Sequence, residues 1–392
     1  MANSTKPRVS FPSLDSLRAL CFLSVFFYHG FSTSTPAQRA DPIWRFVKIG
    51  LFSNGNLGVN FFFVLSGFLI TYLLITERSY LNRIDIPRFW LRRILRIWPL
   101  YFACVAFGFW VFPQFKSLLG AIPSETANPI YYILFISNFD LLINGLPDAS
   151  NLGVLWSIAI EEQFYFIWPL ILAVTPIRRY WLVFSVIIIQ SWVFRALYPS
   201  TSSYEIHTLS CISDMAIGAV AASIVSTYRG AQWVSHWPRG LVVGMHILFF
   251  VAFFFRAQIF FKLPVLHIFE RSIIASLIAC LILYQTHNSW NFLKLPTNGP
   301  LVALGRISYG LYCLHLIGVL AAIEVLKHLA LDTEVWQILI LQPILSLALT
   351  IVAAVLSYRF LEMPFLRLKK RLSYVVRNKA EIVGNEAGIP HR

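Results

Sequence analysis

The sequence predicts an all-α integral membrane protein with about ten transmembrane helices and a basic amphipathic cytoplasmic helix between spans two and three. Three observations predict this fold class. First, 57% of the 392 residues are hydrophobic and only 13% are charged, about half the charged fraction of a soluble domain. Second, the apolar residues come in runs of about 20, the length that a spanning helix needs. Third, the basic residues gather in short segments between these runs, as they do in loops that face the cytoplasm.

About ten apolar runs are long enough to span a bilayer. They cover residues 14–33, 57–76, 97–113, 153–174, 181–198, 207–227, 239–256, 267–286, 301–326 and 336–358. The segment 130–146 is apolar but short, and Asn138, Asp140 and Asn144 interrupt it, so we interpret it as interfacial or re-entrant. With these spans, both termini and most of the 32 Lys and Arg residues face the cytoplasm. An eleventh span at 130–146 is the alternative, but it would place the basic C-terminal tail outside.

Two segments are neither spans nor simple loops. Residues 80–97 alternate arginine with Ile, Leu, Phe and Trp at helical spacing, which predicts a basic amphipathic helix on the inner leaflet. Pro87 suits the first turn of such a helix, where its missing N–H would have no partner anyway. We therefore divide the chain into a transmembrane domain, 1–365, and a basic cytoplasmic tail, 366–392, which is too short for a second globular domain.

Composition also excludes several other classes of site. The five cysteines are odd in number and lie inside apolar runs, so they indicate neither a disulfide framework nor a metal site. The net charge of +14 is not accompanied by zinc-finger spacing or by interleaved aromatic and basic residues, so we expect no nucleic-acid partner. Asp15 and Arg18 stand where the apolar core of a signal peptide would begin, and we expect the first apolar run to remain as a span.

The first apolar run, LDSLRALCFLSVFFYHG, contains ionisable residues, which are costly inside a membrane and are therefore candidates for function. Arg18 and His29 fall within about 20° of the same helical face and about 16 Å apart along the axis. Asp15, one turn before Arg18, is placed to form an ion pair with it. The alternative interpretation is a core histidine and an arginine that extends to the membrane surface.

The fourth span opens with LWSIAIEEQFYFIWPL, which holds two adjacent carboxylates, Glu161 and Glu162. Neighbours in a helix point about 100° apart, so only one of them can face a given cavity. At least one needs a partner or a proton, and a structural ion pair is the alternative to a functional role. In the second span, FFFVLSGFLI, the pair Ser66–Gly67 favours close helix packing over a direct role, although Ser66 remains a candidate.

The ninth span begins LGRISYGLYCLHLIG and carries a polar stripe. Ser308, Tyr312 and His315 fall at i, i+4 and i+7, which is a single helical face. Arg306 marks the cytoplasmic end of this helix. Such a stripe is usually packing, but two deep histidines, each preceded by an arginine toward the cytoplasm, favour a shared cavity with the first span.

These segments occur in the order expected of the acyltransferase-3 family of integral membrane acyltransferases, which the sequence resembles over nearly its whole length. The matching pieces are Arg18-x10-His29 within LDSLRAL…YHG, FFFVLSGFLI, RFWLRRILRIWPLY, LWSIAIEEQFYFIWPL, GRISYGLYCLHL and SYRFLEMPF. Each piece alone is a weak signal, but together and in this order they are a strong one. Many members of the family add an extracytoplasmic SGNH hydrolase-like domain, and here we expect a stand-alone membrane domain without that extension.

The resemblance implies a membrane O-acyltransferase that moves an acyl group, usually acetyl, from acetyl-CoA or another acyl-CoA to a hydroxyl of a cell-envelope glycan or lipid-linked sugar. It implies that Arg18 and His29 are essential and that an arginine pair of the cytoplasmic helix binds the acyl-CoA. That pair is Arg93 with Arg96 or, in another register, Arg88 with Arg92. The implied location is a bacterial inner membrane with both termini in the cytoplasm.

The expected chemistry fits these residue types. Arginines suit the phosphates of CoA, and a neutral histidine near pH 7 can take a proton from a hydroxyl, which makes His29 the candidate base. Glu161 would orient or charge-balance His29, and Arg18 would steer the pantetheine–phosphate arm of CoA or tighten the site; no metal is expected. The leading alternative is a polytopic transporter of a lipid-linked sugar or a small anion, against which the absence of visible repeats counts. An inactive membrane scaffold is a third interpretation.

Overall fold

The computed structural model describes residues 11–33 and 35–371. These residues form helices and connections, with no strand among them. The long helices are α1 (Pro12–Gly30), α4 (Leu57–Leu81), α5 (Ile86–Ala106), α9 (Leu155–Val174), α10 (Tyr180–Leu197), α12 (Thr208–Val225), α14 (Arg239–Phe254), α16 (Pro264–His287), α18 (Ser308–His328) and α19 (Gln342–Ser357).

Shorter helices connect and extend the long ones. The short α-helices are α2 (Pro36–Ala40), α3 (Pro42–Arg45), α6 (Phe112–Leu118), α7 (Pro129–Ile133), α8 (Ser137–Asn144), α11 (Thr201–Ile206), α13 (Tyr228–Ser235), α15 (Arg256–Phe260), α17 (Pro300–Arg306) and α20 (Met363–Arg371). The segments η1 (Phe46–Leu51), η2 (Phe107–Val111), η5 (Gln337–Leu341) and η6 (Tyr358–Glu362) are π-helical, and η3 (Leu152–Val154) and η4 (Ile177–Arg179) are 3₁₀ turns.

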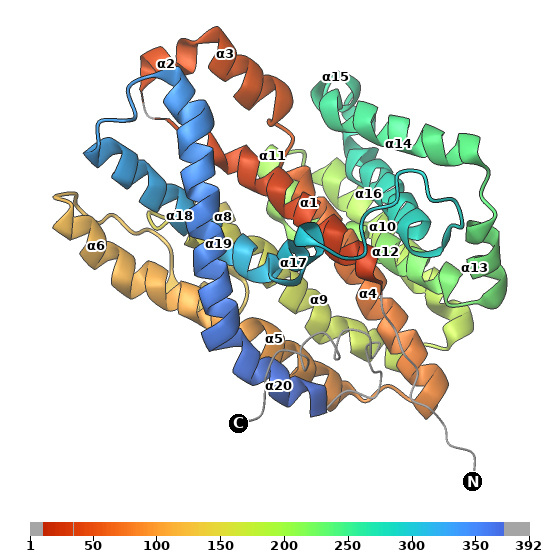
Figure 1. Ribbon diagram of the computed structural model, residues 1–392. Coiled ribbons are helices and arrows are strands. Elements are labelled where there is room, and N and C mark those ends of the chain that lie inside the picture. Colours follow the sequence, from red (N-terminus) through yellow and green to blue (C-terminus); the bar gives the residue numbers. More distant parts are fainter. Residues whose placement is uncertain (1–10, 34, 372–392) are drawn as a thin grey trace, which may run out of the picture.

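The long helices form a bundle with two ends. In Figure 1, α2, α3 and α15 lie at one end, called the upper end below. The connection from α4 to α5 and helix α20 lie at the other, called the lower end. Helix α1 runs through the middle of the bundle, from Pro12 on the lower side to Gly30 near the upper end.

Among the described residues, eight helices are long and apolar enough to cross a membrane, or nine if α13 and α14, which are bent by 85°, form one broken span. The predicted all-α membrane fold is therefore confirmed, with fewer clear spans than expected. All the expected spans fall on helices, but α1 does not pass this test because Asp15, Arg18 and His29 lower its hydropathy. Neighbouring helices of the bundle bury Asp15 and cover Arg18 and His29 in part.

The arginine-rich segment is not a separate helix, which corrects the expectation for residues 80–97. Helix α5 continues through η2 and α6 as one 33-residue helix, Ile86–Leu118, so the arginines occupy the first turns of a span. The start is fixed by Asp85, whose side chain accepts a hydrogen bond from the Arg88 backbone N–H at 3.3 Å, with Pro87 in the first turn. Pro99 lies inside α5 without ending it.

The segment 130–146 does not form a spanning helix. It folds into α7 and α8, two helices of 5 and 8 residues with a break between them. The polar residues that interrupt it hold it in place: Asn138 donates to Thr208 Oγ1 at 3.0 Å and accepts from Gln163 at 3.0 Å. Asp140 accepts from the Asn128 backbone N–H.

Ser66 and Gly67 lie in different surroundings. A Cβ added at Gly67 would lie 2.0 Å from the Met215 carbonyl oxygen, and one added at Gly218 would lie 2.1 Å from the Val64 carbonyl oxygen. The backbones of α4 and α12 therefore touch at this crossing, as the packing interpretation predicts. Ser66 points away from this contact, into a cavity.

The domain boundary expected at residue 365 falls inside α20, Met363–Arg371. The rest of the basic tail, 372–392, lies outside the described residues.

Candidate active site

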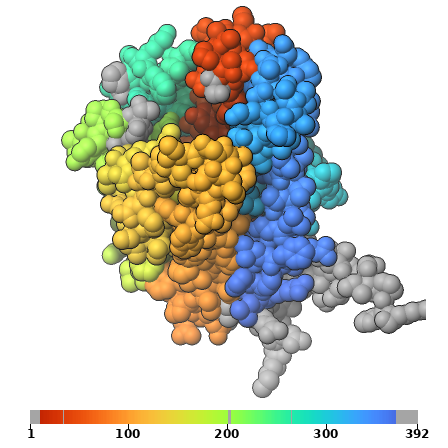
Figure 2. Space-filling model, turned by 90° about the vertical axis from the view of Figure 1, so that its left-hand side faces the viewer, coloured from red at the N-terminus to blue at the C-terminus, as the bar shows by residue number. Residues whose placement is uncertain are grey.

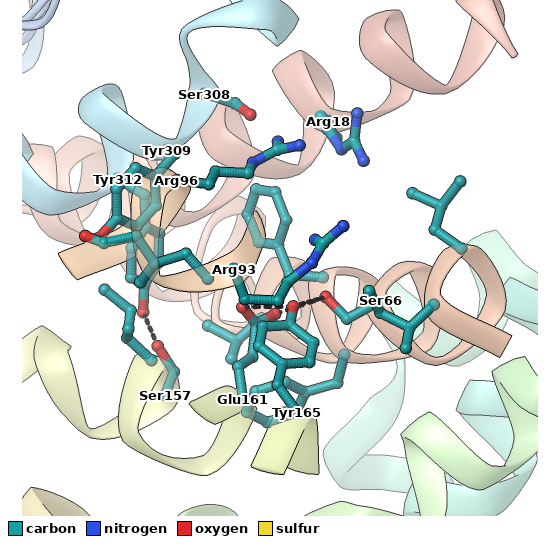
Figure 3. Close-up of a pocket in the computed structure, with 17 residues that line it drawn as sticks. Arg18, Ser66, Arg93, Arg96, Ser157, Glu161, Tyr165, Ser308, Tyr309 and Tyr312 are labelled. Carbon is teal, nitrogen blue, oxygen red and sulfur yellow. Dashed lines mark hydrogen bonds between the residues drawn. The ribbon is translucent and has the colours of Figure 1, made fainter. Parts of the chain in front are cut away.

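A cavity of about 100 Å³ lies between five helices of the bundle. Helix α1 contributes Arg18, α5 contributes Arg93 and Arg96, and α4, α9 and α18 contribute hydroxyl, carboxyl and aromatic groups. Its polar lining residues are Arg18, Ser66, Arg93, Arg96, Ser157, Glu161, Tyr165, Ser308, Tyr309 and Tyr312. Figure 3 shows these side chains around the opening. The structure thus brings together residues from every motif singled out in the sequence except the C-terminal one.

Three arginines share one side of this cavity. Figure 3 shows the guanidinium groups of Arg18, Arg93 and Arg96 gathered there. Arg18 forms the expected ion pair with Asp15, at 2.8 Å. The Nε atom of Arg93 is buried and has no hydrogen-bond partner among the described residues, and its guanidinium lies 5.6 Å from the Tyr165 ring centre. A buried donor without a partner is costly, and an anionic group bound in the cavity could accept from it.

A hydrogen-bonded group of three, Ser66, Glu161 and Tyr165, lies beside Arg93 (Figure 3). Ser66 Oγ donates to Glu161 Oε1 at 2.7 Å. The Tyr165 hydroxyl lies 3.0 Å from Ser66 Oγ and 3.1 Å from Glu161 Oε2. Both oxygens of Glu161 accept from these hydroxyls, and no hydrogen bond joins Glu161 to His29 among the described residues, so the expectation that it orients or charge-balances that histidine stays a prediction.

The other two candidate arginines have structural partners outside the cavity. Arg92 forms a buried ion pair with Glu77 at 2.7 Å, and Glu77 also accepts from the Asp85 backbone N–H. Arg88 pairs with Asp85 at 3.5 Å, and 47% of its side chain is exposed. The structure therefore separates the two possible arginine pairs and places Arg93 with Arg96 in the cavity.

The two deep histidines meet beside the cavity. His29 Nδ1 and His315 Nε2 lie 3.2 Å apart, although α1 and α18 are far apart in the sequence. His315 is fully buried and its Nδ1 lies 2.6 Å from the Tyr312 carbonyl oxygen. The hydroxyl of Tyr312 contacts Ser157 Oγ at 2.7 Å inside the cavity. One tyrosine thus joins the cavity to the histidine pair.

The remaining candidates are placed as the helical faces predicted. Glu162 points away from the Glu161 group and accepts from Trp98 Nε1 at 2.9 Å. Ser308 and Tyr312 line the cavity, and His315 continues their face of α18. Arg306 ends α17, one residue before the break at Ile307, and is not among the lining residues.

Sequence reasoning missed Ser157 and Tyr165 as site residues. Together with Glu161 they fall at i, i+4 and i+8 of α9, so a polar stripe at helical spacing was the available signal. Tyr309, whose hydroxyl donates to the Ile97 carbonyl at 2.7 Å, gave no comparable signal. In residues 11–33 and 35–371, no group of three or more His, Cys, Asp or Glu side chains is close enough to hold a metal ion.

Toward the upper end, the side face seen in Figure 2 has a recess between the red, yellow, teal and blue segments, and its floor has the red of the N-terminal helices. His29 lies in the last turn of α1, close to this end.

Comparisons with known proteins agree with this arrangement. The sequence model of a family described as an acyltransferase domain (Acyl_transf_3) matches residues 11–359. The chain is 29% identical over 376 residues to the peptidoglycan O-acetyltransferase OatA of Listeria monocytogenes, an alignment that covers 90% of this chain and 55% of that protein. It is 27% identical over 372 residues to the O-acetyltransferase OatA of Staphylococcus aureus, which covers 90% of this chain and 57% of that protein.

The chain therefore spans little more than half the length of these curated relatives. No solved structure matches it.

Proposed function

The chain belongs to the acyltransferase-3 family, and from this premise we propose that it transfers an acyl group, in particular acetyl, from acyl-CoA to a hydroxyl of a cell-envelope glycan. The observation that carries the proposal is the gathering of Arg18, Arg93 and Arg96 at one cavity inside an apolar bundle. Family membership counts against the alternative of a transporter. The relatives are named for peptidoglycan and for O-acetylation, which supports a glycan acceptor, free or lipid-linked, and an acetyl donor.

The arginines are the proposed site for the acyl-CoA. Its phosphates and its thioester carbonyl are the negative and polar groups that guanidinium binds with paired N–H donors. Arg93 and Arg96 lie one turn apart on α5, and Arg18 faces them from α1. The donor would enter from the lower end, which also carries most basic residues of the connections. By the positive-inside rule, this end would face the cytoplasm. The bacterial relatives support residence in a bacterial inner membrane.

His29 is the proposed general base. It takes the proton of the acceptor hydroxyl while that oxygen forms a bond to the thioester carbonyl carbon. The carbon–sulfur bond breaks, and the CoA thiolate receives the proton from the imidazolium of His29, so that CoA leaves as the free thiol. The arginines stabilise the negative charge that develops on the carbonyl oxygen in this step.

The test is thiol release by the purified protein in lipid nanodiscs. With acetyl-CoA and soluble peptidoglycan strand fragments, we expect free CoA and an equal amount of fragments that are heavier by one acetyl group. Release of CoA without acetylated fragments would refute the glycan acceptor. No release above that of empty nanodiscs would refute acyl transfer from CoA.

The proposed orientation has its own test. A reporter that is active only in the cytoplasm, fused after α20, should be active, and one inserted in the connection between α18 and α19 should not. The opposite pattern would place the arginines on the side that lacks CoA and contradict the proposed site.

A further inference from the structure

The hydrogen bonds of the histidine pair determine which ring nitrogen carries a proton. A neutral imidazole has one nitrogen that donates and one that accepts, whereas a carbonyl oxygen only accepts. His315 Nδ1 lies 2.6 Å from the carbonyl oxygen of Tyr312, so this nitrogen carries the proton. Nε2 of His315 therefore carries a lone pair, and it is this atom that faces His29.

The same reasoning applies to His29. Its Nδ1 lies 3.1 Å from the Val25 carbonyl oxygen and 3.2 Å from His315 Nε2. Both neighbours accept, and only a protonated Nδ1 satisfies them. The lone pair of His29 is then on Nε2, the nitrogen that is not occupied by this contact. A general base needs such a free lone pair.

We infer that His315 is a positioning residue: it accepts the Nδ1–H of His29, keeps the lone pair of His29 on Nε2, and stabilises the imidazolium that forms when Nε2 takes a proton. A hydrogen bond from a charged donor is about twice as strong as a neutral one, so this contact strengthens during the reaction. His315 then has the role that a carboxylate has beside the histidine of a Ser-His-Asp triad. The catalytic part of this inference rests on the proposed function, but the assignment of the tautomers does not.

Packing holds His315 in this orientation. It is fully buried, and Phe22 lies edge-on to it at 6.3 Å between ring centres. Its Nδ1 is fixed by the backbone of its own helix one turn earlier, at Tyr312. A buried ring with a fixed donor cannot exchange its two nitrogens without leaving a buried polar group without its partner, which is unfavourable.

Two substitutions of His315 separate positioning from packing. The amide of His315→Gln can donate through nitrogen to the Tyr312 carbonyl and accept through oxygen from His29. It therefore keeps the direction of both hydrogen bonds. His315→Leu fills similar space and can do neither. With acetyl-CoA and peptidoglycan strand fragments as probes, we expect kcat to fall about 10- to 100-fold for the leucine variant, less than the loss of about 10²–10⁴ expected when a base itself is removed. We expect the glutamine variant to keep most of kcat and both variants to bind acetyl-CoA normally.

His246 provides a matched control. Its Nδ1 lies 2.7 Å from the carbonyl oxygen of Val242, the same contact to the previous turn that His29 makes, but its ring packs against Tyr284. His246→Leu should leave kcat unchanged. Equal rates for wild type and His315→Leu, or equal losses for the leucine and glutamine variants of His315, would overturn the inference.

The tautomers are tested without any activity. Nitrogen NMR of protein with labelled histidine, near pH 8, should show His29 and His315 both protonated on Nδ1 and bare on Nε2, with signals assigned through His29→Gln and His315→Gln. A proton on Nε2 of either ring would overturn the inference even if acyl transfer is found. A protein that transfers no acetyl group would refute the proposed function, and the NMR result would still decide the tautomers.

Discussion

Two groups of buried charged residues in this bundle differ in whether their arginines form ion pairs with carboxylates. In the cavity, Arg93 and Arg96 form no ion pair with any described carboxylate. Toward the upper end, a second group, called the upper network here, consists of Arg195, Glu205, Asp214, Arg256, Glu270 and Arg271. There Arg271 pairs with Asp214 at 2.8 Å, and Arg256 pairs with Glu205 at 3.4 Å and with Glu270. Arg195 donates to the carbonyl oxygens of Ser210 and Ile268.

The difference shows two ways in which a buried charge can be compensated in a membrane protein. In the upper network, the partner comes from a neighbouring helix, so the charges join α10, α12 and α16. At the cavity, Arg93 and Arg96 have no such carboxylate among the described residues, and the proposed partner is the anionic donor. Buried charge alone therefore does not identify a functional site, and the proposed site differs from the upper network in that its buried cations line a cavity.

The largest expected effect follows from removing the base. His29→Ala should lower the rate of acetyl transfer about 10²–10⁴-fold, because no other group at that position takes the hydroxyl proton. His29→Gln should fail nearly as badly, since an amide hydrogen-bonds but does not accept the proton. Binding of acetyl-CoA, measured by calorimetry, and the unfolding midpoint should stay near those of wild type. A glutamine variant with most of the wild-type rate would show that the base is elsewhere.

Substitutions in the upper network should lower the stability of the protein. Arg271→Ala leaves Asp214 buried without its cation, and breaking a buried pair costs about 3–5 kcal/mol. The double variant Asp214→Leu with Arg271→Met removes both charges and should recover most of that loss. Unfolding of the purified protein by denaturing detergent measures both. If the double variant is as unstable as the single one, the pair is not what stabilises this region.

Removing one cavity arginine should weaken donor binding by an intermediate amount. Arg93→Ala removes hydrogen bonds to a charged ligand, worth about 1.5–3 kcal/mol, or about 10- to 100-fold in the dissociation constant for acetyl-CoA. The matched control is Arg45→Ala, because Arg45 is exposed at the end of α3 at the upper end. Equal losses for both variants would contradict the site and the orientation together.

The smallest effect is expected at Arg88. Arg88 does not line the cavity, and its half-exposed side chain pairs with Asp85 instead. Arg88→Ala should therefore change acetyl-CoA affinity by less than about threefold, the range of a partly exposed charge. A loss as large as that of Arg93→Ala, in the same titration, would mean that the other arginine register binds the donor.

The sequence predicted the features that depend only on the spacing of residues within a single helix. The ion pair of Asp15 and Arg18, the common face of Ser308, Tyr312 and His315, and the divergence of Glu161 from Glu162 all follow from helical spacing. The sequence did not predict which arginine pair lines the cavity, because Glu77, the partner of Arg92, lies on another helix.

The spacing of residues within one helix also could not predict contacts between helices that are distant in the sequence. The pairing of His29 with His315 needs α1 beside α18, and that of Asp214 with Arg271 needs α12 beside α16. Sequence reasoning did not single out Asp214 or Arg271 at all. Glu161 was assigned to His29 for the same reason: its hydroxyl partner Ser66 comes from α4. Helix-to-helix placement, not residue chemistry, was the missing information.

The most direct test of the account is whether acetyl-CoA occupies the cavity. Ser66→Cys places a thiol in the lining, while the native cysteines are buried or partly buried. Ser289→Cys places one at an exposed position that does not line the cavity and serves as the control. We predict that acetyl-CoA slows alkylation of the thiol at position 66 and leaves the rate at position 289 unchanged. Equal rates with and without acetyl-CoA at position 66, at concentrations that saturate binding, would contradict the account.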